Sequence, residues 1–163
     1  MVRTSVLLRA DLPRGFHRVS GQHRPVDPSL ADPSLGLCGA RFDSGRFRLA
    51  VHRVAFSATG NRGGVRSEVV AYEPGHVEHA LAELEAAAHG CARPVKPSAE
   101  QQPDLLVLRL RVTGPDGLRR HDLMVERRGD VVSLLEVDDR LGGLTLPLAR
   151  RVGNRLEARQ PVS

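Results

Sequence analysis

The sequence predicts a single α+β domain, in which one antiparallel sheet of about five strands carries a long central helix and a C-terminal helix on one face. Three observations lead to it. Apolar residues alternate with polar ones in short segments, the turns between them are too short for parallel connections, and two segments carry apolar stripes at helical spacing. With 163 residues, the chain allows one sizeable core. Residues 1–163 are therefore expected to form one domain, with 1–36 largely loop and 37–159 as the core.

The first two strands are predicted at 46–58 and 65–72, where β-branched and aromatic residues are frequent. The glycine-rich segment 61–64 between them predicts a tight turn, so the two strands should form a hairpin. In 46–58 the apolar residues of the first half are out of phase with those of the second half. We therefore expect a bulge near 52–53.

A central helix is predicted after this hairpin. Its apolar stripe recurs at three- and four-residue steps and consists of Val77, Ala80, Leu81, Leu84, Ala87 and Ala88. Pro74 suits the first turn of a helix, because its missing N–H costs little there. Gly90 suits the left-handed position that ends a helix and leads directly into Cys91.

Three more strands are predicted at 105–112, 118–126 and 131–137, joined by short turns into an antiparallel meander. Leucine and valine occupy one face of the first of these strands. Arg109 and Arg111 occupy the other, which is expected to look outward or into a groove.

The last predicted element is a helix within 144–159, where Leu148, Val152 and Leu156 stand four residues apart. Arginines surround this stripe, so we expect the helix to lie on the sheet with its arginines in solvent. The alternative is a basic amphipathic helix on a membrane surface, but the stripe has none of the Trp or Phe anchors that would favour it.

The formal net charge of +5 and the isoelectric point near 10.4 raise the question of nucleic-acid binding. The basic residues are almost all arginines scattered among 19 acids, with Lys96 the exception, and aromatic residues make up only 3 % of the chain. Stacking aromatics of the kind that single-strand binders use are therefore scarce. An Arg-rich cytoplasmic nucleic-acid-binding protein remains an alternative function.

The sequence holds no apolar stretch of the length of a membrane helix, and the apolar run 6–8 is too short for a secretory signal. Two expectations follow. Either the protein is cytoplasmic, or an export or lipid-anchor segment is missing from this chain.

The only two cysteines, Cys38 and Cys91, belong to no C-x-x-C pair, so a metal site or a thioredoxin-type redox pair is poorly supported. Two buried free thiols are one interpretation. A Cys38–Cys91 disulfide is the favoured one, and it would persist in an oxidising compartment.

Other chemistry-bearing residues form no complete site. His76 and His79 have no third metal ligand at a telling spacing, and the glycine-rich turn lacks the Lys and Ser/Thr of a phosphate loop. His121 and Asp122 could form part of a small hydrolase, but Ser67 and Ser133 fall in the middle of strands. The acidic cluster of Glu136, Asp138 and Asp139 lacks calcium-hand spacing. We predict no catalytic residue, no metal and no cofactor.

Four stretches together resemble a known family: LLRADLPRGF near the start, Cys38 after a proline-rich loop, SEVVAYEPG leading into HALAELEAAAHGC, and LARRVGNRLEA near the end. They resemble the sensor-domain lipoproteins of actinobacteria. These are related to the extracellular sensor domain that follows the membrane helix in some mycobacterial serine/threonine kinases.

The resemblance implies a non-enzymatic α+β module outside the membrane, with a groove for an unidentified small ligand or cell-envelope component. Cys38 and Cys91 match the paired cysteines of that family, whereas the second disulfide of the kinase domain has no counterpart here. The chain also lacks a signal sequence or lipobox cysteine, so contact with a membrane would need a missing N-terminal anchor. The ligand-binding residues stay unknown.

Overall fold

The computed structural model describes residues 6–25, 40, 42–60, 63–89, 92–94, 105–114, 117–141, 144, 147–148, 150–152 and 154. Within these ranges, the backbone alone is described for 20–25, 92–94, 105–114, 117–119 and 139.

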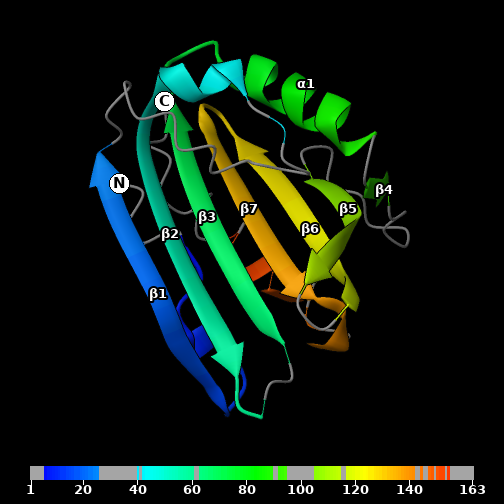
Figure 1. The fold of residues 1–163 in the computed structure, drawn as a ribbon. Coiled ribbons are helices and arrows are strands. Elements are labelled where there is room, and N and C mark those ends of the chain that lie inside the picture. Colours follow the sequence, from blue (N-terminus) through cyan, green and yellow to red (C-terminus); the bar gives the residue numbers. More distant parts are fainter. Residues whose placement is uncertain are drawn as a thin grey trace.

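The described part of the chain is built around one antiparallel sheet with the strand order β1-β2-β3-β7-β6-β5-β4 (Figure 1). Its strands are β1 (Phe16–Pro25), β2 (Arg48–Ala58), β3 (Gly64–Tyr72), β4 (Ala92–Pro94), β5 (Leu105–Gly114), β6 (Gly117–Arg128) and β7 (Val131–Asp138). The helical elements are α1 (Val77–Ala88) and the short 3₁₀ turns η2 (Arg9–Asp11), η4 (Asp43–Phe47) and η5 (Asp139–Leu141).

The five strands predicted from the sequence all form, as β2, β3, β5, β6 and β7, and they are contiguous in the sheet. The hairpin and the meander are confirmed by their antiparallel registers. Two further strands extend the sheet to seven, because β1 and β4 add one edge each. The expectation of a loop is therefore wrong for β1. Its sequence is polar, but it forms an edge strand that pairs with β2 on one side only.

The bulge in β2 lies at a different place from the expected one. The pairing of β2 with β3 shifts between Arg48 and Ala50, whereas the register from Ala50 to Ser57 is continuous across 52–53. Val54, Phe56 and Ala58 are consequently buried on one face, and Leu49 beside the shift is 54 % exposed.

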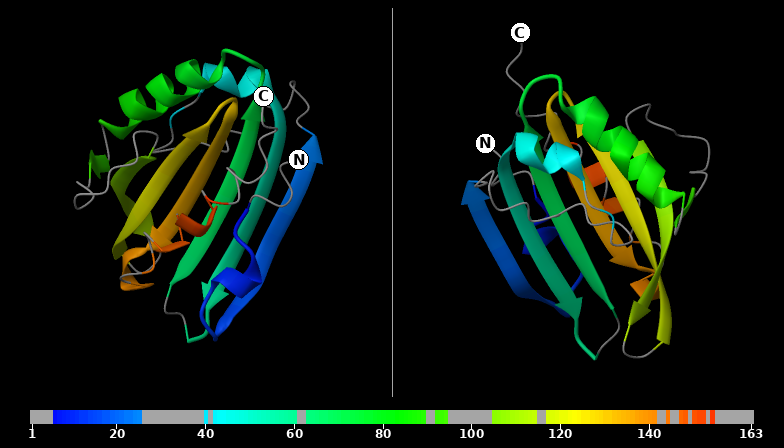
Figure 2. Two further views of the ribbon diagram at one scale, coloured as in Figure 1. Left: turned by 180° about the vertical axis from the view of Figure 1, so that it is seen from behind. Right: turned by 45° about the horizontal axis from the view of Figure 1, so that its top comes forward.

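Strand alternation gives the sheet two faces, and each carries its own core cluster. The face that we call the α1 face holds Phe42, Val70, Tyr72, Val77, Ala80, Leu84, Ala88, Leu123, Val125, Val132 and Leu134. The face that we call the terminal face holds Val6, Leu7, Leu12, Phe16, Val54, Phe56, Ala58, Val65, Val69, Met124, Leu135, Val137, Leu148 and Val152. Figure 2 shows α1 on one side of the sheet and the first and last described segments on the other.

The expectation that both helices lie on one face is therefore wrong. Leu148 and Val152 are each 1 % exposed and pack in the terminal-face cluster, opposite α1. The physical reason lies in β3 and β7, whose consecutive residues 67–70 and 132–135 are buried, so both faces are covered there. Strands of this kind must be covered on both sides, in contrast to the half-polar pattern of 105–112.

The central helix forms, but with 12 residues it is three turns rather than long. Val77, Ala80, Leu84 and Ala88 of the predicted stripe are buried against the α1 face, and Leu81 and Ala87 are partly buried there. Pro74 lies in the turn before the helix rather than in its first turn. The turn ends at Gly75, whose φ of 84° suits a residue without a side chain.

At the C-terminal end, the described residues among 147–154 are helical, and Leu148 and Val152 form their buried side. The helix predicted within 144–159 extends over residues that the structure does not describe, so its full length stays a prediction. The side chains of Arg109 and Arg111 also lie outside the described atoms. Among the described residues, no helix has the length and apolar content needed to cross a bilayer.

Candidate functional site

A pocket of about 310 Å³ opens on the α1 face at the end of the sheet where β2 turns into β3. We call it the hairpin-end pocket. It lies at the opposite end of the strands from α1, which crosses the upper end of the sheet in Figure 1. Its lining residues are Ala55, Phe56, Ser57, Gly63, Gly64, Val65, Arg66, His121, Glu136, Asp138 and Arg140. Four strands and the turn after β7 thus contribute to a single depression.

Sheet register brings together the three central polar residues of the pocket. Arg66 on β3 and Glu136 on β7 are direct cross-strand partners, and Nη2 of Arg66 donates to Oε2 of Glu136. His121 on β6 stands opposite Asp138, one alternation further along β7, and its Nδ1 lies 2.7 Å from Oε1 of Glu136. Both carboxylate oxygens of Glu136 are therefore engaged.

Glu136 is held ionised. Burial alone would raise its pKa, but the hydrogen bond from His121 and the charge of Arg66 outweigh burial, so the pKa of Glu136 lies below its ordinary value of 4.5. An ionised carboxylate can only accept hydrogen bonds, so Nδ1 of His121 must carry the proton in this contact.

Asp138 forms the second ion pair of the pocket, with Arg140 in the turn after β7. The Arg140 backbone N and Nε donate to Oδ1 at 3.1 and 3.0 Å, and Nη2 donates to Oδ2 at 2.7 Å. These hydrogen bonds lower the pKa of Asp138 below its ordinary value of 3.8. Gly63 closes over this pair, since a Cβ at Gly63 would lie 2.8 Å from the Asp138 Cγ.

The charges of the pocket are layered. The side chains of Glu136 and Asp138 are 14 % and 4 % exposed, whereas those of Arg66 and Arg140 are 59 % and 42 % exposed. The acids thus lie at the base of the pocket with their oxygens occupied, and the guanidinium groups lie at its mouth. Such a site offers hydrogen-bond donors to a ligand more readily than acceptors.

The hydrolase pair proposed from the sequence is not brought together. His121 and Asp122 are neighbours on β6, so alternation directs them to opposite faces, His121 to the α1 face and Asp122 to the terminal face. The carboxylate that contacts His121 belongs to Glu136, not to Asp122. Ser67 and Ser133 lie inside strands as predicted, are buried, and are on the terminal face, away from His121.

The two histidines considered as metal ligands each contact another side chain of the protein. His76 stacks on the Phe47 ring at a centroid distance of 3.6 Å, and Nε2 of His79 lies 3.4 Å from Oε1 of Glu83. Within the described residues, no three His, Cys, Asp or Glu side chains are arranged to hold a metal ion. Cys38 and Cys91 lie outside the described residues, so their disulfide stays a prediction.

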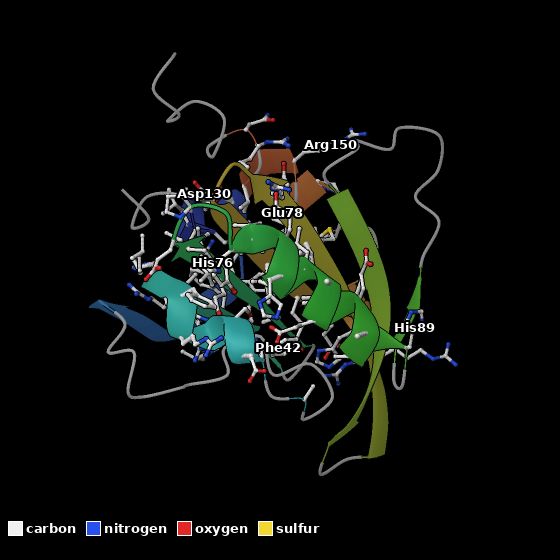
Figure 3. All side chains as sticks on the ribbon, turned by 90° about the horizontal axis from the view of Figure 1, so that it is seen from above. Phe42, His76, Glu78, His89, Asp130 and Arg150 are labelled. Atoms are coloured by element: carbon white, nitrogen blue, oxygen red, sulfur yellow. The ribbon has the colours of Figure 1, made fainter. Side chains whose placement is uncertain are left out.

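A second polar cluster lies beneath η4 and is closed to solvent. Ser44, Arg48, Glu68 and Tyr72 are all at most 4 % exposed. The carboxylate of Glu83 on α1 accepts hydrogen bonds from the backbone N–H groups of Asp43 and Ser44, which fastens η4 over the cluster. Burial raises the pKa of the Tyr72 hydroxyl although the charge of Arg48 opposes it. Figure 3 labels a residue on each side of the sheet. Phe42, which precedes η4, lies beside α1, whereas Arg150 lies on the side opposite α1. The four residues of this cluster are therefore shielded from solvent by the described part of the chain.

Sequence reasoning missed Arg66 and Arg140, and it considered Glu136 and Asp138 only as part of an acidic cluster without calcium-hand spacing. Each residue is unremarkable in its own segment, because the pocket depends on the order of the strands. Opposite charges at paired positions of neighbouring strands could have revealed the pocket. Recognising such pairs requires the register of β3 with β7, which the sequence alone does not give.

Comparisons with known proteins add one finding about the fold. No protein-family model matches the chain, and no curated protein matches it. A solved structure that is similar is the extracellular domain of PknH from Mycobacterium tuberculosis. Its TM-score is 0.58 and its sequence identity 14 %, and the match covers 94 % of this chain and 95 % of that chain. The chain therefore shares the fold of this extracellular domain over nearly its whole length.

Proposed function

We propose that this chain is an extracytoplasmic, non-enzymatic sensor module that binds a small ligand in the hairpin-end pocket. The observation that carries the proposal is the pocket itself, whose polar groups come from β3, β6, β7 and the turn after β7. A ligand held there would contact elements that are far apart in the sequence, so its binding would be communicated to most of the sheet. A volume of about 310 Å³ suits a small molecule.

Two further observations support parts of the proposal. The shared fold with an extracellular domain of a mycobacterial protein supports an extracytoplasmic location. The separation of His121 from Asp122, and of both from Ser67 and Ser133, removes the only hydrolytic set that the sequence suggested. This separation supports a binding role for the pocket.

The test is a ligand screen by two-dimensional NMR on the ¹⁵N-labelled chain, with neutral, cationic and anionic small molecules. We expect at least one class to shift the amide signals of pocket residues such as Gly64 and Arg66. Ala55→Trp should fill the pocket and abolish these shifts. Ala82→Trp is the matched control, because Ala82 is exposed on α1, away from the pocket. Shifts that survive Ala55→Trp, or a screen in which no compound perturbs the pocket, would contradict the proposal.

A further inference from the structure

We propose that the hairpin-end pocket recognises an oxyanion, the carboxylate or phosphate group of a small solute, and that Arg66 is its principal binding residue. This inference rests on the proposed function and names the class of ligand. It follows from which hydrogen-bonding groups of the pocket are already used within the protein and which remain.

Both carboxylates of the pocket already have basic partners within the protein. Glu136 receives Arg66 on one oxygen and His121 on the other, and Asp138 receives three hydrogen bonds from Arg140. A cation would meet the exposed guanidinium groups of Arg66 and Arg140 before it reached these carboxylates. The carboxylates at the base of the pocket therefore serve to hold the basic side chains and are poorly placed to bind a cation.

Donors remain on Arg66. A guanidinium carries five N–H donors, and among the described residues Arg66 contacts the protein through Nη2 alone. The side chain is 59 % exposed at the pocket mouth, so its other N–H groups are accessible. A planar guanidinium edge matches the two oxygens of a carboxylate or phosphate.

The rest of the lining sets the size of the ligand. Ala55, the cross-strand partner of Arg66, provides an apolar side chain, and Ser57 adds a hydroxyl. Gly63 and Gly64 bring the backbone close, and a side chain at Gly63 would overlap Asp138. The geometry suits an acid group joined to a short apolar portion.

The β2–β3 pair supplies a matched control. Arg53 and Glu68 form a cross-strand ion pair on the same α1 face, with Nε of Arg53 2.6 Å from Oε2 of Glu68. Arg53 does not line the pocket. Replacing Arg53 or Arg66 by glutamine removes one positive charge from the protein in each case, so any difference between the two variants reports the pocket and not the overall charge of +5.

The experiment titrates the ¹⁵N-labelled chain with propionate, a phosphate monoester and inorganic phosphate at constant ionic strength, with chloride as the reference anion. We expect saturable shifts at Gly64 and Arg66. Arg66→Gln should weaken the binding by about tenfold or more, as expected for loss of a charge-assisted hydrogen bond. Arg53→Gln should leave it nearly unchanged. The relative affinities of the propionate and phosphate arms then identify which oxyanion is preferred.

A second variant tests the role of the internal carboxylate. Glu136→Gln leaves Arg66 without an ionic partner, so oxyanion binding should tighten by about threefold to tenfold. Equal weakening in Arg53→Gln and Arg66→Gln would show non-specific attraction and overturn the proposal. Neutral or cationic compounds that shift the pocket where no oxyanion does would overturn the ligand class but leave the proposed function standing. If no compound perturbs the pocket, both fail.

Discussion

Glu136 is the residue on which the hairpin-end pocket depends, because it connects three strands at once. Its two oxygens hold Arg66 of β3 and His121 of β6, and its own backbone belongs to β7. The sequence predicted β7 correctly but offered Glu136 only as part of an acidic cluster that lacks calcium-hand spacing. It could not predict the two basic partners, since both come from strands whose neighbours are set by tertiary register.

The lowered pKa values of Glu136 and Asp138 predict that the protein loses stability in acid. Both groups bind protons less readily in the folded chain than in the unfolded one, so their contribution is complete above their ordinary values of 4.5 and 3.8 and is lost as the pH falls through the folded values. Urea unfolding between about pH 6 and pH 3 measures this decline. Glu136→Gln should cost about 1–2 kcal/mol at the upper pH and should flatten the pH dependence.

Glu85 provides the control for this acid series. It is exposed on α1 and has no ion-pair partner among the described residues. Glu85→Gln should reproduce the slope of the unmodified chain. A Glu136→Gln variant whose stability falls with acid as steeply as that of the unmodified chain would show that this carboxylate is not responsible.

At the scale of elements, α1 and the C-terminal helical residues cover opposite faces of the sheet. Their apolar stripes were both recognisable in the sequence, since spacing alone reveals a buried side. Their placement was not, because a stripe does not specify which face it meets. The consecutive apolar residues at 69–72 in β3 and at 134–135 in β7 were the overlooked clue that both faces need a cover.

This arrangement predicts that α1 and the C-terminal segment stabilise the sheet independently. Leu84 and Leu148 are each 1 % exposed, in different core clusters, so each change to alanine should cost about 2–5 kcal/mol. The double variant should be additive within about 0.5 kcal/mol. Leu84→Ala combined with Val132→Ala, within one cluster, is the pair expected to deviate. The free energy of unfolding in urea measures all of these variants, and strong coupling between Leu84 and Leu148 would contradict the two-faced core.

At the scale of the whole molecule, local patterns predicted five of the strands and the central helix, and long-range pairing decided the rest. β1 escaped prediction because its sequence, FHRVSGQHRP, is polar and contains Gly21 and Pro25. Such a sequence is tolerated on an edge strand, where one side of the backbone has no partner in the sheet. The pocket was not predicted for a related reason, because its residues become neighbours only through the strand order β2-β3-β7-β6.

The extracytoplasmic proposal makes its sharpest prediction at Cys38 and Cys91. Their described neighbours Ala40 and Ala88 pack in the same α1-face cluster. Each cysteine is therefore close in sequence to a residue of this cluster. By chain entropy, a disulfide across a loop of this length would stabilise the fold by roughly 4 kcal/mol.

Intact mass measurement and thiol alkylation of non-reduced protein from cells should therefore find no free thiol. Adding a reductant should lower the free energy of unfolding by roughly the same 4 kcal/mol in the unmodified chain. The double variant Cys38→Ala/Cys91→Ala serves as the control, because its stability should not respond to the reductant. Two alkylated cysteines in cell-derived material would contradict both the disulfide and the oxidising compartment, because thiols are kept reduced in the cytosol. The fold and the hairpin-end pocket would stand in that case, because none of their described contacts involves either cysteine.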